Sequence, residues 1–119
     1  MYFYKNLNTT DIITSRTDLV EIPGFELLTA NTTDAAVEKH VPEVTQDGSR
    51  LLVKVGSVEH PMLDAHYIMF IALETCCALQ QKFLSPGEKP EAEFILAEGE
   101  KALAVYEFCN LHGLWKKEL

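Results

Sequence analysis

The chain carries four histidines and three cysteines, which are residue types that bind first-row transition metals. All four histidines lie beside turn or loop signals. Cys109 and His112 form a Cys-x-x-His pair, short enough for both side chains to reach one ion. His60 and His66 are six residues apart, and the proline between them favours a loop that could return to the same ion. These patterns predict one metal centre, with the ligands His40, His60, His66, Cys109 and His112.

The size of this ligand set narrows the choice of metal. Structural zinc sites use four ligands in a tetrahedron, and four nitrogens with one sulfur exceed that number. The set suits an iron ion with five protein ligands and one open position. Because a Cys-x-x-His pair also occurs without a metal, other interpretations stay open. They are a structural module holding zinc or inert iron, an electron-transfer protein, and an enzyme that uses Cys109 as a nucleophile.

Composition and charge exclude several classes of protein. The chain has 119 residues, 47% of them hydrophobic, which is enough for one compact domain with a core. Its net charge of -8 opposes nucleic-acid binding, and an anionic substrate would need a local positive focus. No apolar run approaches a membrane span, and no basic flank precedes an apolar stretch at the N-terminus. We therefore expect no membrane partner and a cytoplasmic location.

The elements that position the candidate ligands are expected to be short strands. Pro-Gly pairs at 23–24 and 86–87, and Asp47-Gly48, are turn signals between apolar or alternating segments. The run 66–73 is apolar on both faces, as in a central strand covered on both sides. Residues 98–108 contain good helix formers, but their alternation favours a strand. The pattern predicts an all-β sandwich with further strands at 19–22, 25–28, 43–45, 50–55, 78–84 and 91–96, and a polar linker at 29–34.

Four motifs follow one another along the chain. They are Glu38-Lys39-His40-Val41-Pro42, Val55-Gly56-Ser57-Val58-Glu59-His60-Pro61-Met62, Lys82-Phe83-Leu84-Ser85-Pro86-Gly87 and Cys109-Asn110-Leu111-His112-Gly113-Leu114-Trp115. Together they closely resemble the superoxide reductases, the desulfoferrodoxin and neelaredoxin family. The resemblance implies an immunoglobulin-like, seven-stranded β-sandwich with one mononuclear non-haem iron, Fe2+ or Fe3+, per chain. The four histidines would ring the iron, Cys109 would bind it axially, and the sixth position would be open.

The resemblance also implies an enzyme, a superoxide reductase that reduces superoxide by one electron to hydrogen peroxide. Lys39 and Glu38 are its implied catalytic residues: Lys39 would attract superoxide, and Glu38 would occupy the open position after oxidation. An external donor such as a rubredoxin-like protein would supply the electrons, and the relatives with two iron centres suggest a homodimer. A non-catalytic metal-binding or electron-transfer module is the alternative.

The N-terminal part departs from the relatives with two iron centres, which bind a second iron through four cysteines. No cysteine precedes Cys76. We therefore expect residues 1–37 to form a small N-terminal desulforedoxin-like β segment without metal ligands, and residues 38–119 to form the iron-binding β-sandwich. Cys76 and Cys77 match no motif and are interpreted as small residues near a strand end. Trp115 is expected to pack over the ligand loop.

Overall fold

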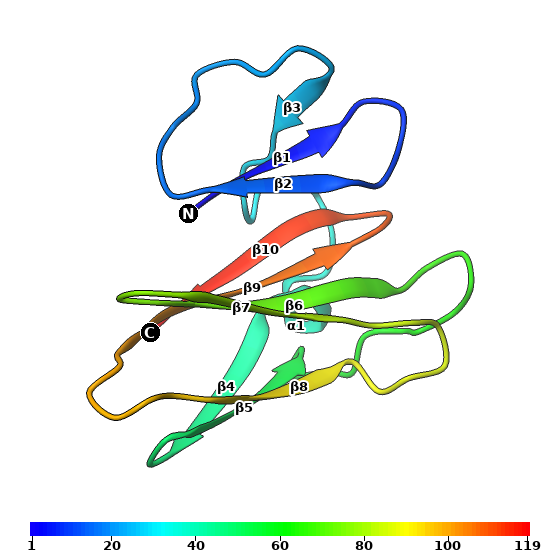
Figure 1. Ribbon diagram of the computed structural model, residues 1–119. Helices are drawn as coiled ribbons and strands as arrows, with labels where there is room; N and C mark the ends of the chain where they lie inside the picture. Colours follow the sequence, from blue (N-terminus) through cyan, green and yellow to red (C-terminus); the bar gives the residue numbers. More distant parts are fainter.

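Three antiparallel sheets are stacked in the computed structural model, which describes residues 1–119 (Figure 1). The N-terminal sheet has the order β2-β1-β3 and contains β1 (Tyr2–Asn6), β2 (Ile12–Ser15) and β3 (Phe25–Leu27). The central sheet, β10-β9-β6-β7, contains β6 (Ile68–Thr75), β7 (Leu79–Phe83), β9 (Ala102–Cys109) and β10 (Gly113–Glu118). The third sheet, β4-β5-β8, contains β4 (Pro42–Asp47), β5 (Arg50–Val55) and β8 (Glu91–Ile95). A single helical turn, α1 (Val37–His40), precedes β4.

The central sheet is covered on both faces because its strands are apolar on both faces. In β6, Ile71 and Leu73 belong to the cluster shared with the third sheet, whereas Phe70 and Ala72 belong to the cluster shared with the N-terminal sheet. Successive side chains of a strand point to opposite faces, so one strand can serve two cores. The prediction of a central strand covered on both sides is confirmed.

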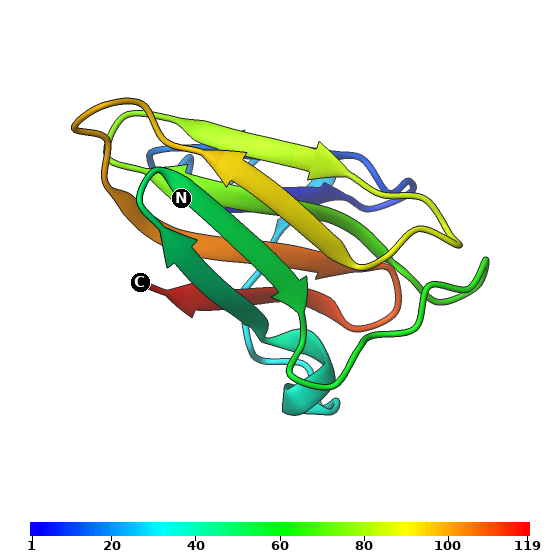
Figure 2. The ribbon, with the colours of Figure 1, turned by 90° about the horizontal axis from the view of Figure 1, so that it is seen from below.

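The central and third sheets form a seven-stranded β-sandwich, which confirms the all-β fold class. Figure 2 shows the third sheet lying across the central one. Leu51, Val53 and Val55 alternate along β5 and point into the space between the two sheets, where all three are fully buried or nearly so. No helix in the structure is long and apolar enough to cross a bilayer.

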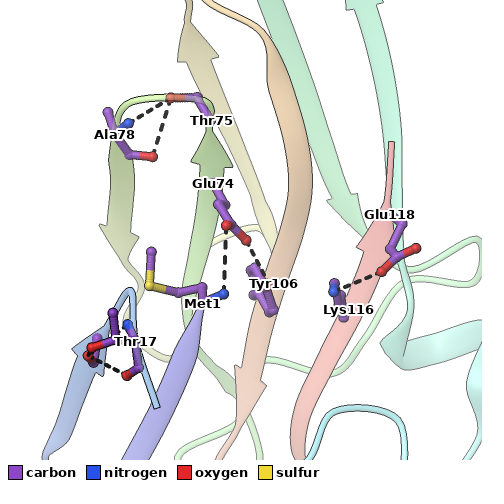
Figure 3. Close-up of polar contacts among 9 residues, drawn as sticks. Met1, Thr17, Glu74, Thr75, Ala78, Tyr106, Lys116 and Glu118 are labelled. Atoms are coloured by element: carbon purple, nitrogen blue, oxygen red, sulfur yellow. Dashed lines mark hydrogen bonds and ion pairs between the residues drawn. The ribbon is translucent and has the colours of Figure 1, made fainter. Parts of the chain in front are cut away.

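The N-terminal sheet packs on the outer face of the central sheet. The Phe3 ring lies 4.8 Å from the ring of Tyr106 and 6.1 Å from that of Phe70. The Tyr106 hydroxyl donates a hydrogen bond to Glu74 at 2.9 Å, and the amino group of Met1 lies 3.6 Å from the same carboxylate (Figure 3). An aromatic contact and a shared carboxylate therefore join the two sheets.

Two features of the N-terminal part differ from the prediction. The expected strand at 19–22 was wrong: Val20 has a positive φ of 63°, and side chains rather than a neighbouring strand satisfy the local backbone. The Tyr4 hydroxyl accepts the N–H of Leu19, and the Asp18 carboxylate accepts that of Val20. The positions of strands β1 and β2, by contrast, were not predicted, although residues 1–37 were expected to form a small β segment. The side-chain contacts at Leu19 and Val20 compete with strand pairing, and they leave no periodicity in the sequence.

The connection expected at 29–34 leads from β3 to α1 along the edge of β10. The Asn31 side chain accepts the N–H of Lys116 at 2.9 Å and donates to the carbonyl of the same residue at 3.2 Å. Its own N–H donates to the carbonyl of Leu114 at 3.0 Å. These hydrogen bonds extend the pairing of the central sheet beyond its edge strand β10. They also direct the chain toward α1, which carries the first candidate ligand.

Candidate metal centre

His40 ends helix α1, and the loop after β5 positions that helix. The Glu38 carbonyl accepts the N–H of Val58 at 2.9 Å and the hydroxyl of Ser57 at 3.2 Å. A Cβ atom on Gly56 would lie 2.6 Å from the same carbonyl oxygen, a distance that side chains essentially never adopt. Only glycine therefore lets the loop approach α1 this closely.

The rings of His40 and His60 are oriented by backbone carbonyls. His40 Nδ1 lies 2.7 Å from the carbonyl oxygen of Ala36, and His60 Nδ1 lies 2.6 Å from that of Pro61. A carbonyl only accepts hydrogen bonds, so each Nδ1 carries the proton and each Nε2 presents a lone pair. The two Nε2 atoms nevertheless face each other at 3.2 Å. Such an arrangement suits a cation that both atoms bind, with the carbonyls as the outer-shell partners of the ligands.

The remaining candidate ligands are His66 in the segment before β6, Cys109 at the end of β9 and His112 in the turn that follows β9. His112 Nδ1 lies 3.1 Å from His40 Nε2 and 3.9 Å from Cys109 Sγ. His66 Nε2 is buried without a hydrogen-bond partner. A buried nitrogen without a partner costs free energy unless something satisfies it, and a bound ion would do so.

Asn110 joins the segment that contains His66 to the turn that contains His112. Its side chain accepts the N–H of Tyr67 at 2.9 Å and donates to the carbonyl of Ala65 at 3.0 Å. These two hydrogen bonds hold the residues on either side of His66. Asn110 lies within the Cys109-Asn110-Leu111-His112 motif, but its positioning role was not predicted from the sequence.

The four imidazole rings form a closed ring in which each neighbour is nearly perpendicular to the next. Centroid distances between neighbours are 4.7–5.0 Å, and the interplanar angles are 76–86°. All five donor atoms lie within 4.8 Å of one another. Nitrogen ligands at about 2.1 Å from an ion and at right angles to each other are about 3.0 Å apart. The observed separations of 3.1 and 3.2 Å therefore fit adjacent ligands of one ion, and the five residues fit a metal.

The protonation states of the ligands agree with metal binding. The pKa of His60 is lowered to about 4, chiefly by burial; the Pro61 carbonyl opposes this shift, and the neighbouring histidines add to it. Burial likewise lowers the pKa of His40. Burial raises the pKa of Cys109, which the backbone N–H groups of Leu111 and His112 only partly offset. Neutral imidazoles are the form that binds metals, whereas the thiolate needs a nearby cation. A buried thiol with a raised pKa also argues against Cys109 as a free nucleophile.

Glu107 is a buried acidic residue that was not predicted from the sequence. It is 0% exposed, neither carboxylate oxygen has a partner, and burial raises its pKa well above the usual value. It alternates with Val105 and Cys109 on the side of β9 that faces the third sheet. A glutamate between apolar strand residues usually marks a solvent-facing position, so the sequence offered no signal.

Trp115 covers the centre, as expected. Its ring stacks on that of His40 with centroids 4.9 Å apart, and its Nε1 donates to the carbonyl of His112 at 3.0 Å. It is only 2% exposed. The indole therefore shields one ligand from water and fixes the backbone of another.

Lys39 lies next to the centre. It lines a surface hollow of about 500 Å³ together with His60 and Pro61, and it makes no ion pair. Burial lowers the pKa of His66, and the positive charges of His112 and Lys39 add to this effect. The side chain of Glu38 is exposed beside it.

Comparison with known proteins gives one family. The family model for desulfoferrodoxin matches residues 32–118. A desulfoferrodoxin of Syntrophotalea carbinolica is 51% identical over 94 residues, which is 79% of this chain and 73% of that protein. The superoxide reductase of Treponema pallidum aligns over 98% of both chains with a TM-score of 0.83 and 36% identity. That of Giardia intestinalis covers 69% of this chain and 99% of its own, with a TM-score of 0.59 and 30% identity.

Proposed function

The chain belongs to the desulfoferrodoxin family, and we infer that it is a superoxide reductase, an oxidoreductase that reduces superoxide to hydrogen peroxide. The observation that carries this function is the closed ring of four histidines with Cys109 beside it, all within the residues that the family model matches. Superoxide, one electron and two protons give one hydrogen peroxide. One iron ion per chain, bound by His40, His60, His66, Cys109 and His112, supplies that electron by changing between Fe2+ and Fe3+.

The protein residues prepare the centre for this chemistry. The carbonyls of Ala36 and Pro61 hold the rings of His40 and His60 with their Nε2 lone pairs inward. Trp115 keeps water from one side. Iron held by these five residues would keep the capacity to bind one more small ligand, and the Cys109 thiolate would donate electron density to the ion.

Lys39 is proposed as the residue that attracts superoxide. The chain has a net charge of -8, so an anion needs a local positive group. Lys39 is unpaired and lines the hollow beside His60, where its ammonium group would attract the anion and donate a hydrogen bond to it. Glu38 is proposed as the ligand of the sixth position after oxidation, since its backbone is held by Val58 while its carboxylate is free.

An external protein is proposed as the electron donor, and a rubredoxin-like protein is the proposed class. His66 and His112 are only partly buried, unlike His40 and His60. Two ligands at the surface give a docked donor a short path to the ion. A homodimer is also proposed, because the N-terminal part exposes apolar side chains, among them Val20 at 86% and Leu7 at 58%.

The proposed domain division places residues 1–37 in a desulforedoxin-like segment without metal and residues 38–119 in the iron-binding domain. The stacking of the first sheet on the sandwich supports this division. A cytoplasmic location is proposed because all three cysteines are free thiols.

The metal content and visible spectrum of the purified protein test this function against the alternatives. We expect one iron per chain and a colour that develops when superoxide oxidises the reduced protein. Zinc, or a protein that stays colourless, would instead indicate a structural metal-binding module. Iron that changes oxidation state with an external donor but not with superoxide would indicate an electron-transfer module.

A further inference from the structure

Cys76 and Cys77 form an exposed pair of thiols in the turn between β6 and β7, and the iron centre does not use them. The side chain of Thr75 holds this turn, because its hydroxyl accepts the N–H of Ala78 at 2.9 Å (Figure 3). The same hydroxyl accepts the N–H of Cys77 at 3.3 Å. The last residue pair of the β6–β7 ladder is Glu74 with Leu79. The peptide bond between the two cysteines therefore lies outside the ladder, and the hydroxyl of Thr75 rather than a paired strand accepts its N–H.

Both sulfur atoms lie against the same short segment before β9. Cys76 Sγ accepts the backbone N–H of Lys101 at 3.4 Å, and Cys77 Sγ donates to Glu100 Oε2 at 3.6 Å. Because Glu100 and Lys101 are neighbours in the chain, the two thiols lie on one side of the turn. Adjacent residues in a regular strand would instead point to opposite faces.

The contacts of the two thiols differ in kind. The N–H of Lys101 is a donor that a thiolate on Cys76 would accept more strongly than a thiol does. Glu100 instead faces the proton of Cys77. The hydrogen bond of Cys77 with Thr75 acts to lower its pKa, but desolvation, the Cys76 thiol and the Glu100 carboxylate outweigh it and raise the pKa. The sulfur of Cys76, which accepts a hydrogen bond, is thus placed to attack first, and Cys77, whose proton faces Glu100, is placed to react second.

We propose that Cys76 and Cys77 form a dithiol that hydrogen peroxide oxidises reversibly to a disulfide between adjacent residues. In the first step Cys76 Sγ attacks one peroxide oxygen, the O–O bond breaks, and a sulfenic acid and water form. In the second step Cys77 Sγ attacks the sulfur of that sulfenic acid, an S–S bond forms and the S–O bond breaks. Glu100 accepts the Cys77 proton and passes it to the departing hydroxide, which leaves as a second water. Two thiols and one peroxide give one disulfide and two waters.

The oxidant is the product of the proposed function, so peroxide is produced by the same molecule. The disulfide would be easy to reduce. Adjacent Cα atoms are about 3.8 Å apart, whereas ordinary disulfides join Cα atoms about 4.4–6.8 Å apart, so the ring would be strained. Strained, exposed disulfides have more oxidising potentials, and a cellular dithiol would restore the reduced form.

Mass spectrometry of the iron-loaded protein after treatment with hydrogen peroxide tests the proposal. We expect the peptide that contains both cysteines to become lighter by two hydrogens, with loss of both alkylatable thiols and their recovery on reduction with dithiothreitol. In Cys77→Ser, the sulfenic acid should persist on Cys76 and react with a sulfenic-acid probe. In Cys76→Ser, no intramolecular disulfide should form.

Disulfide-linked dimers, oxygen addition to the two cysteines independently, or unchanged thiols would each overturn the proposal. Because peroxide is added directly, the result does not depend on whether the iron centre produces it. A second arm supplies superoxide to the reduced protein under anaerobic conditions, with and without catalase. If the disulfide forms with added peroxide but not in this arm, the dithiol stands and peroxide production at the iron centre fails.

Discussion

The Nε2 atoms of His40 and His60 face each other at 3.2 Å, although the Nδ1 atom of each ring already contacts a backbone carbonyl. Neither Nε2 atom can donate to the other while Nδ1 holds the proton. Two facing lone pairs repel each other, and a cation bound by both would relieve that repulsion. A one-turn helix and the loop after β5 position the two rings. The folded chain is therefore prepared for a metal.

Removal of the iron should destabilise the protein. A metal that binds only the folded state at a hundredfold excess over its Kd contributes about 2.7 kcal/mol. That corresponds to roughly 10 °C in the melting temperature of a domain of this size. Thermal unfolding followed by circular dichroism, before and after chelation, measures the effect. Readdition of Fe2+ should restore the original transition, and identical transitions in all three samples would contradict the account.

The variant Gly56→Ala should shift helix α1 and weaken iron binding. The added Cβ would lie 2.6 Å from the Glu38 carbonyl oxygen, so the loop or the helix must move. Overpacking of this kind costs about 1–3 kcal/mol in the free energy of unfolding. Denaturant unfolding and the iron content after dialysis report the two effects.

Ser57→Ala is the matched control for Gly56→Ala. It removes only the hydroxyl that donates to the same carbonyl, at an exposed position, and should cost about 1 kcal/mol or less. Equal losses of iron in both variants would mean that the close approach at Gly56 does not position the helix.

The variant Cys109→Ser should abolish the visible thiolate-to-iron charge-transfer band of the oxidised protein. The thiol lies 3.9 Å from His112 Nδ1, and it is the buried sulfur of the cluster. Absorption spectra of oxidised samples test this assignment. Cys76→Ser serves as the control and should keep the band, since its sulfur contacts Lys101 instead. A band that persists in Cys109→Ser would show that it does not come from the Cys109 thiolate.

The variant Lys39→Ile should slow the reaction with superoxide by about tenfold or more, and weaken its dependence on salt, because a local positive charge steers the anion. Iron should stay bound, since Lys39 is not a ligand. Pulse radiolysis of the reduced protein at several ionic strengths measures the rate. Lys117→Ile removes an exposed lysine of β10 and should leave the rate unchanged. Equal rates in the two variants would remove Lys39 from the proposed mechanism.

The sequence predicted those features that depend on a local pattern, such as a turn signal or the alternation of apolar residues. All four histidines sit beside turns, and the run at 66–73 is apolar on both faces, so the ligand group and the covered central strand were both predictable. Contacts between segments that are distant in the sequence were not predictable. Three features form only when the two sheets have packed together. They are the hydrogen bonds of the Asn110 side chain, the close approach of Gly56 to α1 and the burial of Glu107. The side-chain contacts that replace a strand at 19–22 likewise follow no period.

The ratio of hydrogen peroxide formed to superoxide consumed tests the central claim most directly. The iron-loaded, reduced protein is mixed anaerobically with superoxide, and peroxide, oxygen and the oxidation of the iron are measured together. A superoxide reductase gives one peroxide for each superoxide, with one iron oxidised and no oxygen released. One peroxide for every two superoxides, with oxygen released, would indicate dismutation and contradict the account, as would iron that stays reduced.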